Sequence, residues 1–139
     1  DRFFRKQPPK TAGREQFGRE FVERLVASKL PLEDLVTTAT AFTAAAVAAA
    51  VRRFVRPRMP VHDLIVSGGG VHNPRIMAYL AAFLPDVNIY TSADFGVDPD
   101  AKEAIAFAIL AYETWHKRPA NLPSATGARR PVVLGKISP

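Results

Sequence analysis

An α/β fold is the class that this 139-residue sequence predicts, because three patterns in its middle follow the order of a strand, a turn and a helix. The apolar residues 64–66 indicate a buried strand, and the three glycines at 68–70 indicate a turn. Asn73 and Pro74 are typical of a helix N-cap and of the first helical position. An amphipathic helix should follow, and residues 87–91 predict a second strand. Strand, helix and strand in this order form a βαβ unit, in which the two strands are parallel.

The first half of the chain predicts two helices after an irregular loop. Residues 8–15 contain two prolines and a glycine and cannot form a regular helix. A helix is expected from Phe17 to near Lys29, with apolar residues recurring along one face. A second helix should begin close to Pro31 and continue unbroken to Phe54. Because it is rich in alanine, we expect it to be long, mostly buried and packed closely on a sheet or another helix.

The last third of the chain predicts one more alanine-rich helix, from Ala101 to about His116. Asp98 or Asp100 is expected to cap the start of this helix. Turn-forming residues follow it, and residues 131–137 predict a short terminal strand or an extended tail.

Length and composition limit the classes of protein that the chain can represent. The length suits one domain or one lobe of a larger protein. The sequence begins without methionine, a signal peptide or a transit segment, so we expect an internal start. The absence of cysteine excludes disulfides, thiolate metal ligands and a cysteine nucleophile. The apolar stretch 39–51 contains two threonines and precedes two arginines, so no membrane span is predicted, and the cytoplasm is the expected location.

The net charge of +6 raises the question of a nucleic-acid partner. Basic residues are densest at 52–58, the end of the second predicted helix, where the helix dipole favours positive charge in any protein. No aromatic residues alternate with them, and no zinc-finger or helix-turn-helix spacing accompanies them. Nucleic acid is therefore not an expected partner.

The glycine stretch at 68–70 is the main candidate site, because it follows a predicted strand at the edge where open α/β folds bind ligands. It differs from the dinucleotide fingerprint, since Asn73 stands where the last glycine would be, and no Lys-Ser or Lys-Thr pair makes it a P-loop. The pattern favours the close approach of a base or ribose to bare backbone. A plain turn followed by an N-cap would also account for these residues.

Other polar residues carry weaker signals. His72 either contacts a ligand or finishes the turn, and neither His62 nor His116 has a partner at metal-ligand spacing, so no metal site is assigned. No Gly-x-Ser-x-Gly nucleophile elbow occurs. Three residues of the N-terminal loop either bind an anion or set the loop, and the sequence does not choose between the two: Lys10, Arg14 and Glu15.

Five motifs in the same order carry a resemblance to a known family. They are PPKTAGRE at 8–15, VSGGGVHNPR at 66–75, DAKEAIAFA at 100–108, NLPSATGA at 121–128 and VVLGKISP at 132–139. Together they resemble the C-terminal portion of the anhydro-N-acetylmuramic acid kinases, and the likeness covers essentially the whole chain. The resemblance implies the actin, hexokinase and sugar-kinase superfamily, in which two ribonuclease-H-like lobes close on ATP and a sugar. Residues 1–139 would then be the C-terminal nucleotide-binding lobe, in incomplete form.

The resemblance also implies roles for particular residues. Gly68, Gly69 and Gly70, with Asn73 at the start of the next helix, would bind the adenosine of ATP. Glu103 would face the cleft between the lobes and accept a hydrogen bond from the sugar. The family opens the 1,6-anhydro ring of anhydro-N-acetylmuramic acid with water and phosphorylates O6, using Mg²⁺ and ATP in cell-wall recycling. The product is N-acetylmuramic acid 6-phosphate.

The glycine-rich phosphate loop and the catalytic aspartate of that family have no counterpart here and are expected upstream. No catalytic residue is therefore assigned on this chain, Mg²⁺ is expected to be held mainly by the missing lobe, and the chain alone should be inactive. Two alternatives stay open. One is the closely similar levoglucosan kinase, and the other is a non-catalytic module that binds nucleotide or forms a homodimer.

Overall fold

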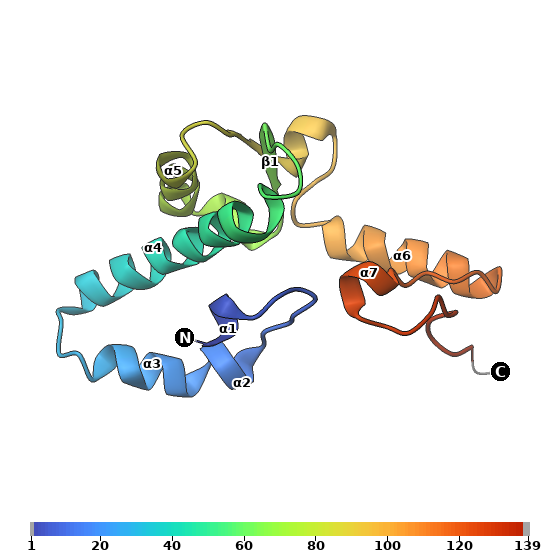
Figure 1. Cartoon of the computed structure of the whole chain (residues 1–139), viewed down its shortest axis with the longest axis horizontal. Coiled ribbons are helices and arrows are strands. Elements are labelled where there is room, and N and C mark those ends of the chain that lie inside the picture. The colour runs from blue at the N-terminus through green and yellow to red at the C-terminus, as the bar shows by residue number, and fades with distance from the viewer. Residues whose placement is uncertain (1, 138–139) are drawn as a thin grey trace.

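The computed structural model, which describes residues 2–137, contains the predicted parallel βαβ unit (Figure 1). Strand β1 (Asp63–Val66) pairs in parallel with β2 (Asn88–Thr91), with Asp63 opposite Asn88 and Val66 opposite Thr91. Helix α5 (Pro74–Phe83) connects the two strands. The α/β class is therefore confirmed. The expectation of a buried first strand is wrong, because its residues alternate between exposed and half-buried and Ile65 is 51% exposed.

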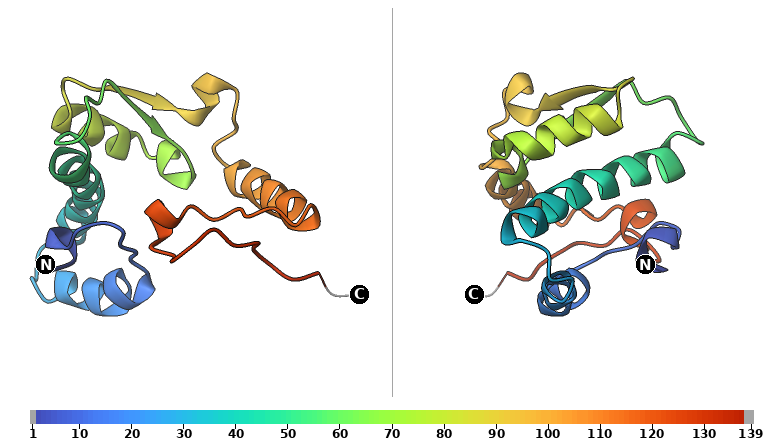
Figure 2. Two further views of the ribbon diagram at one scale, coloured as in Figure 1. Left: turned by 45° about the vertical axis from the view of Figure 1, so that its right-hand side comes forward. Right: turned by 90° about the vertical axis from the view of Figure 1, so that its left-hand side faces the viewer.

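The small core lies where helix α4 (Leu32–Ala50) passes the crossover unit. The buried residues Ala48, Val51, Leu84 and Val87 form one cluster, against which half-buried side chains from both strands pack. Helices α4 and α5 run side by side in both views of Figure 2. Ala44 and Ala48 are almost fully buried in α4, so the expected close approach of an alanine face to another helix is confirmed.

The rest of α4 departs from the expectation of a mostly buried helix. Only Ala44 and Ala48 of its residues are buried, while Leu32 and Val36 are largely exposed, because nothing within residues 2–137 covers that face. A π-helical turn (Val51–Val55) continues the helix. By length and composition alone, the combined segment Leu32–Val55 could cross a membrane, whereas the sequence predicts no membrane span. One such helix is weak evidence, because the core helix of a soluble protein has the same length and composition.

Arginines after α4 hold this helix to the end of α5. Arg56 forms an ion pair with Asp86 at 2.7 Å, and Arg52 donates a hydrogen bond to the carbonyl of Phe83. Arg58 donates to the carbonyl of Phe54 at 3.3 Å. The basic cluster thus makes contacts within the fold.

The N-terminal segment forms three short helices, of which α3 (Arg19–Val26) covers most of the helix expected from Phe17 to near Lys29. Helices α1 (Arg2–Arg5) and α2 (Arg14–Phe17) are not predicted by the sequence, and α2 begins within the loop expected at 8–15. The chain breaks at Gly18, where an added Cβ would lie 2.1 Å from the carbonyl oxygen of Arg14. Five phenylalanine rings hold these helices to α4 with centroid distances of 5.2 to 6.1 Å: Phe3, Phe4, Phe17, Phe21 and Phe42.

Lys10 holds the N-terminal loop in place through contacts within the fold. Of the two roles that the sequence left open for it, anion binding or setting the loop, these contacts support the second. Its ammonium donates to the carbonyl of Phe3 at 3.0 Å and lies 4.7 Å and 4.4 Å from the ring centres of Phe3 and Phe54. A cation held over aromatic faces ties the loop to the helix behind it.

After β2 the chain turns through a 3₁₀ helix (Ser92–Phe95) that is capped by its own acid. The backbone N–H and the hydroxyl of Thr91 donate to one carboxylate oxygen of Asp94 at 2.7 and 2.9 Å. These bonds, the backbone bond first, hold the pKa of Asp94 below its ordinary value of 3.8.

This capping predicts an acid-sensitive contribution to stability. A carboxyl whose pKa is lowered by folding stabilises the folded state above pH 3.8 and loses that contribution as the pH falls through the lowered value. The difference in unfolding free energy between wild type and Asp94→Asn should therefore be constant at neutral pH and shrink below pH 3.8. Denaturant titrations at several pH values measure it, and a difference that does not change with pH would contradict the assignment.

The C-terminal third consists of α6 (Lys102–Trp115), α7 (Pro123–Thr126) and a tail. Neither predicted aspartate caps α6, because Asp98 accepts from the backbone N–H of Asp100 at 2.9 Å and Asp100 turns toward His72. The sequence predicts either a short strand or an extended tail for residues 131–137. In the described chain these residues are extended and pair with no strand. The tail is tied to α6 by a hydrogen bond from the hydroxyl of Thr114 to the carbonyl of Leu134.

Candidate functional site

The glycine turn after β1 exposes its backbone, as the sequence predicts. Gly68 has φ +85° and ψ 176°, a conformation that is essentially restricted to glycine. A 3₁₀ turn (Gly69–His72) follows directly. A Cβ added at Gly69 or Gly70 would meet no other atom within 4 Å. The bare backbone at these two positions therefore faces open space in which a ligand can approach.

Asn73 is the N-cap of α5, as predicted. Its Oδ1 accepts hydrogen bonds from the backbone N–H groups of Arg75 at 3.0 Å and Ile76 at 3.3 Å, and Pro74 occupies the first helical position. The side-chain oxygen is thus used by the helix, whereas its amide nitrogen is left for another partner. A nucleotide contact by Asn73 stays a prediction.

Two substitutions separate these roles of Asn73. Asn73→Ala removes the cap and is expected to lower the free energy of unfolding by about 1 kcal/mol. Asn73→Asp keeps the accepting oxygen and should unfold at nearly the wild-type denaturant concentration, but it lacks the amide donor. If both variants unfold as the wild type does, the cap contributes nothing.

Two hollows flank the glycine turn. A groove of about 480 Å³ lies between β1, α4 and α5, with Ser67, Gly70 and Lys102 at its edge. A smaller and more polar hollow of about 340 Å³ adjoins Asn73 and is lined by Val36, Thr37, Thr40, Asn73, Arg75 and Tyr79. A larger hollow of about 570 Å³ lies elsewhere, between α6 and the apolar side chains of the tail. The first two hollows are the ones that adjoin the turn.

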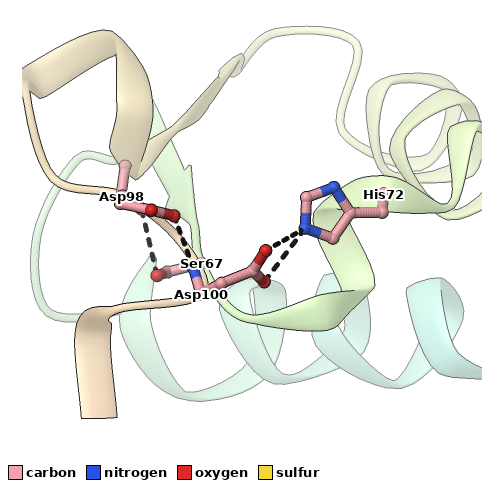
Figure 3. Close-up of polar contacts among 5 residues, drawn as sticks. Ser67, His72, Asp98 and Asp100 are labelled. Atoms are coloured by element: carbon pink, nitrogen blue, oxygen red, sulfur yellow. Dashed lines mark hydrogen bonds and ion pairs between the residues drawn. The ribbon is translucent and has the colours of Figure 1, made fainter. Parts of the chain in front are cut away.

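The ends of the two strands and the start of α6 meet at the glycine turn. The buried Ser92 donates its hydroxyl to that of Ser67 at 3.0 Å, which joins the carboxyl ends of β1 and β2. His72 Nε2 lies 3.0 and 2.9 Å from the two carboxylate oxygens of Asp100, and the side chains point toward one another in Figure 3. No pattern in the sequence indicates this pair, because 28 residues separate its members and neither motif requires the other.

Glu103 lies in the first turn of α6, directly after Lys102, whose ammonium is 4.0 Å from the place of a Cβ on Gly68. Glu103 is exposed, and its carboxylate has no hydrogen-bond or ion-pair partner within residues 2–137. It is available to a ligand, although an acid is favourable in any first turn. The start of α6 thus lies near the glycine turn, and a sugar contact by Glu103 stays a prediction.

Among residues 2–137, no three carboxylate or imidazole groups come close enough together to hold a metal ion. The use of Mg²⁺ stays a prediction.

A parallel strand pair whose carboxyl ends meet a bare glycine turn is typical of α/β proteins that bind ligands at that edge. The family described as "Anhydro-N-acetylmuramic acid kinase" matches residues 1–139. The chain therefore belongs to the anhydro-N-acetylmuramic acid kinase family, a family of sugar kinases.

Individual relatives agree with this assignment. The chain is 44% identical over 140 residues to an anhydro-N-acetylmuramic acid kinase of Salinibacter ruber, which covers 98% of the chain and 35% of the relative. It is 46% identical over 142 residues to that of Caldanaerobacter subterraneus, covering 99% and 36%. A Bacillus cereus enzyme of the same description is 44% identical, with 98% and 37% covered. The chain thus spans about a third of the length of the curated relatives it matches.

Proposed function

We propose that residues 1–139 form the C-terminal nucleotide-binding lobe of an ATP-dependent anhydro-sugar kinase, with the ribonuclease-H-like architecture of the sugar-kinase superfamily. Its substrate is anhydro-N-acetylmuramic acid, and its setting is the recycling of cell-wall sugars in the cytoplasm. The observation that carries the proposal is the similarity to named kinases over 98–99% of the chain, a similarity that includes the glycine turn.

In this proposal the glycine turn binds the adenosine end of ATP. Backbone without side chains at Gly69 and Gly70 permits a base or ribose to lie against the chain, and the polar hollow at Asn73 offers hydroxyl, amide and guanidinium groups beside it. Phosphate binding is left to residues outside this chain, since the turn has no Lys-Ser or Lys-Thr pair.

The free carboxylate of Glu103 accepts a hydrogen bond from a sugar hydroxyl and so orients the anhydro ring. In the reaction a water oxygen bonds to C1 while the bond from C1 to O6 breaks, and O6 takes the γ-phosphoryl group as ADP leaves. The proton of the water goes to a base that this chain does not supply. The contribution of this chain is to position nucleotide and sugar relative to one another.

Assay of the full-length protein with ATP tests the proposal against its alternatives. Phosphorylation of anhydro-N-acetylmuramic acid at O6 is the expected result, followed by mass spectrometry of the sugar product. Activity on levoglucosan alone would show that levoglucosan, and not anhydro-N-acetylmuramic acid, is the substrate. ATP binding by calorimetry without activity on either sugar would overturn the kinase assignment and leave a nucleotide-binding module.

A further inference from the structure

The side-chain contact between His72 and Asp100 joins two segments that the proposed function assigns to different ligands. His72 ends the glycine turn, and Asp100 lies two residues before α6. Figure 3 shows the imidazole and the carboxylate facing one another, at 2.9 and 3.0 Å. Among residues 2–137, no other hydrogen bond connects residues 68–73 to residues 98–103.

Stability does not account for this pair. The two side chains are 60% and 64% exposed, and an ion pair that exposed contributes only about 0 to 1 kcal/mol to folding. Its effect is therefore on geometry: it limits how far the start of α6 can move from the glycine turn.

Both partners are attached to fixed backbone, so the link can transmit position. Asp100 is held by the bond from its own backbone N–H to Asp98 at 2.9 Å, and the N–H of Ala101 donates to the carbonyl of Asp98 at 3.2 Å. His72 directly precedes Asn73, the capped start of α5. Helix α6, in contrast, has no buried residue of its own, so packing holds it weakly.

We propose that His72 and Asp100 are positioning residues that set the first turn of α6, and with it Glu103, at a fixed distance from the glycine turn. The distance between the nucleotide site and the sugar site is thereby kept constant. This inference rests on the proposed function for its catalytic consequence. Its structural part, the restraint of α6 by the pair, does not depend on which ligand binds.

The test compares His72→Ala, Asp100→Asn, the double variant and His72→Arg in the full-length protein. Each single loss should lower kcat with anhydro-N-acetylmuramic acid by up to about 5-fold, because a contact of about 1 kcal/mol or less biases the position of the reactant by no more than that. ATP affinity without sugar should stay within about twofold, since the turn itself is intact. The double variant should be no worse than either single one, and His72→Arg should recover most of kcat, because arginine also pairs with Asp100.

A control at the far end of α6 is Arg118→Ala, which breaks the ion pair with Glu113 and should leave kcat unchanged. Hydrogen exchange at Ile105, whose backbone N–H donates to the carbonyl of Ala101 at the start of α6, gives a readout that needs no activity, and it should be faster in His72→Ala and Asp100→Asn. Unchanged exchange, additive losses or an inactive His72→Arg would overturn the inference. If the wild-type protein is inactive on every anhydro sugar, the proposed function is overturned. The restraint of α6 by the pair is then still tested by hydrogen exchange.

Discussion

Gly69→Val in the full-length protein is expected to lower the affinity for ATP by about 10-fold or more, equivalent to about 1.4 kcal/mol, while the fold is retained. A Cβ added at Gly69 would meet no atom of the described residues within 4 Å beyond its chain neighbours, so the new side chain extends into the space proposed for the ligand. Gly69 also lies outside the left-handed region, so a side chain adds no backbone strain of that kind. Calorimetric titration with ATP measures the affinity, and thermal unfolding checks the fold.

Gly68→Ala is the matched contrast one residue earlier. There φ is +85° and ψ 176°, so any side chain should cost about 1 to 3 kcal/mol of stability through backbone strain. The two variants therefore separate a loss of binding from a loss of folding. Wild-type affinity in Gly69→Val would mean that the glycines form a plain turn and bind no nucleotide.

Glu103→Gln is expected to lower kcat/KM for the anhydro sugar by about 10- to 100-fold, because hydrogen bonds to a charged group contribute about 1.5 to 3 kcal/mol. The KM for ATP should not change. The substitution keeps the size of the side chain and removes the charge of a carboxylate that has no partner within the described residues. Steady-state kinetics with each substrate varied in turn give both parameters.

Glu113→Gln serves as the control on the same helix, since Glu113 is paired with Arg118 and lies about three helical turns from Glu103. It should leave kcat/KM for the sugar at the wild-type value. If Glu103→Gln changes only the unfolding free energy, by about 0.3 to 1 kcal/mol, then Glu103 acts on the helix dipole and not on a substrate.

Local features of the site could be predicted from the sequence because their causes lie within a few residues. Asn73 and Pro74 begin a helix through their own chemistry, and the glycines at 68–70 form a turn because they lack a Cβ. The parallel pairing of β1 and β2 followed from the length of the helix between them. These predictions needed no knowledge of distant partners.

Other features could not be predicted, because the local residue pattern does not determine them. The apolar periodicity runs on across Gly18, where the helix nevertheless breaks. Burial of α4 was overestimated because composition shows how apolar a face is but not whether anything covers it. The contact between His72 and Asp100 depends on where two loops meet, and no periodicity encodes that.

The two-stranded sheet has a further consequence for how this chain must be handled. In the described chain, each strand is paired with another strand on one side only. The backbone amide and carbonyl groups along the outer sides of β1 and β2 are therefore unpaired by any strand among these residues. Such edges attract other strands and promote aggregation when nothing protects them. Residues 1–139 prepared on their own should therefore self-associate, and added neighbouring sequence that extends or shields the sheet should restore solubility.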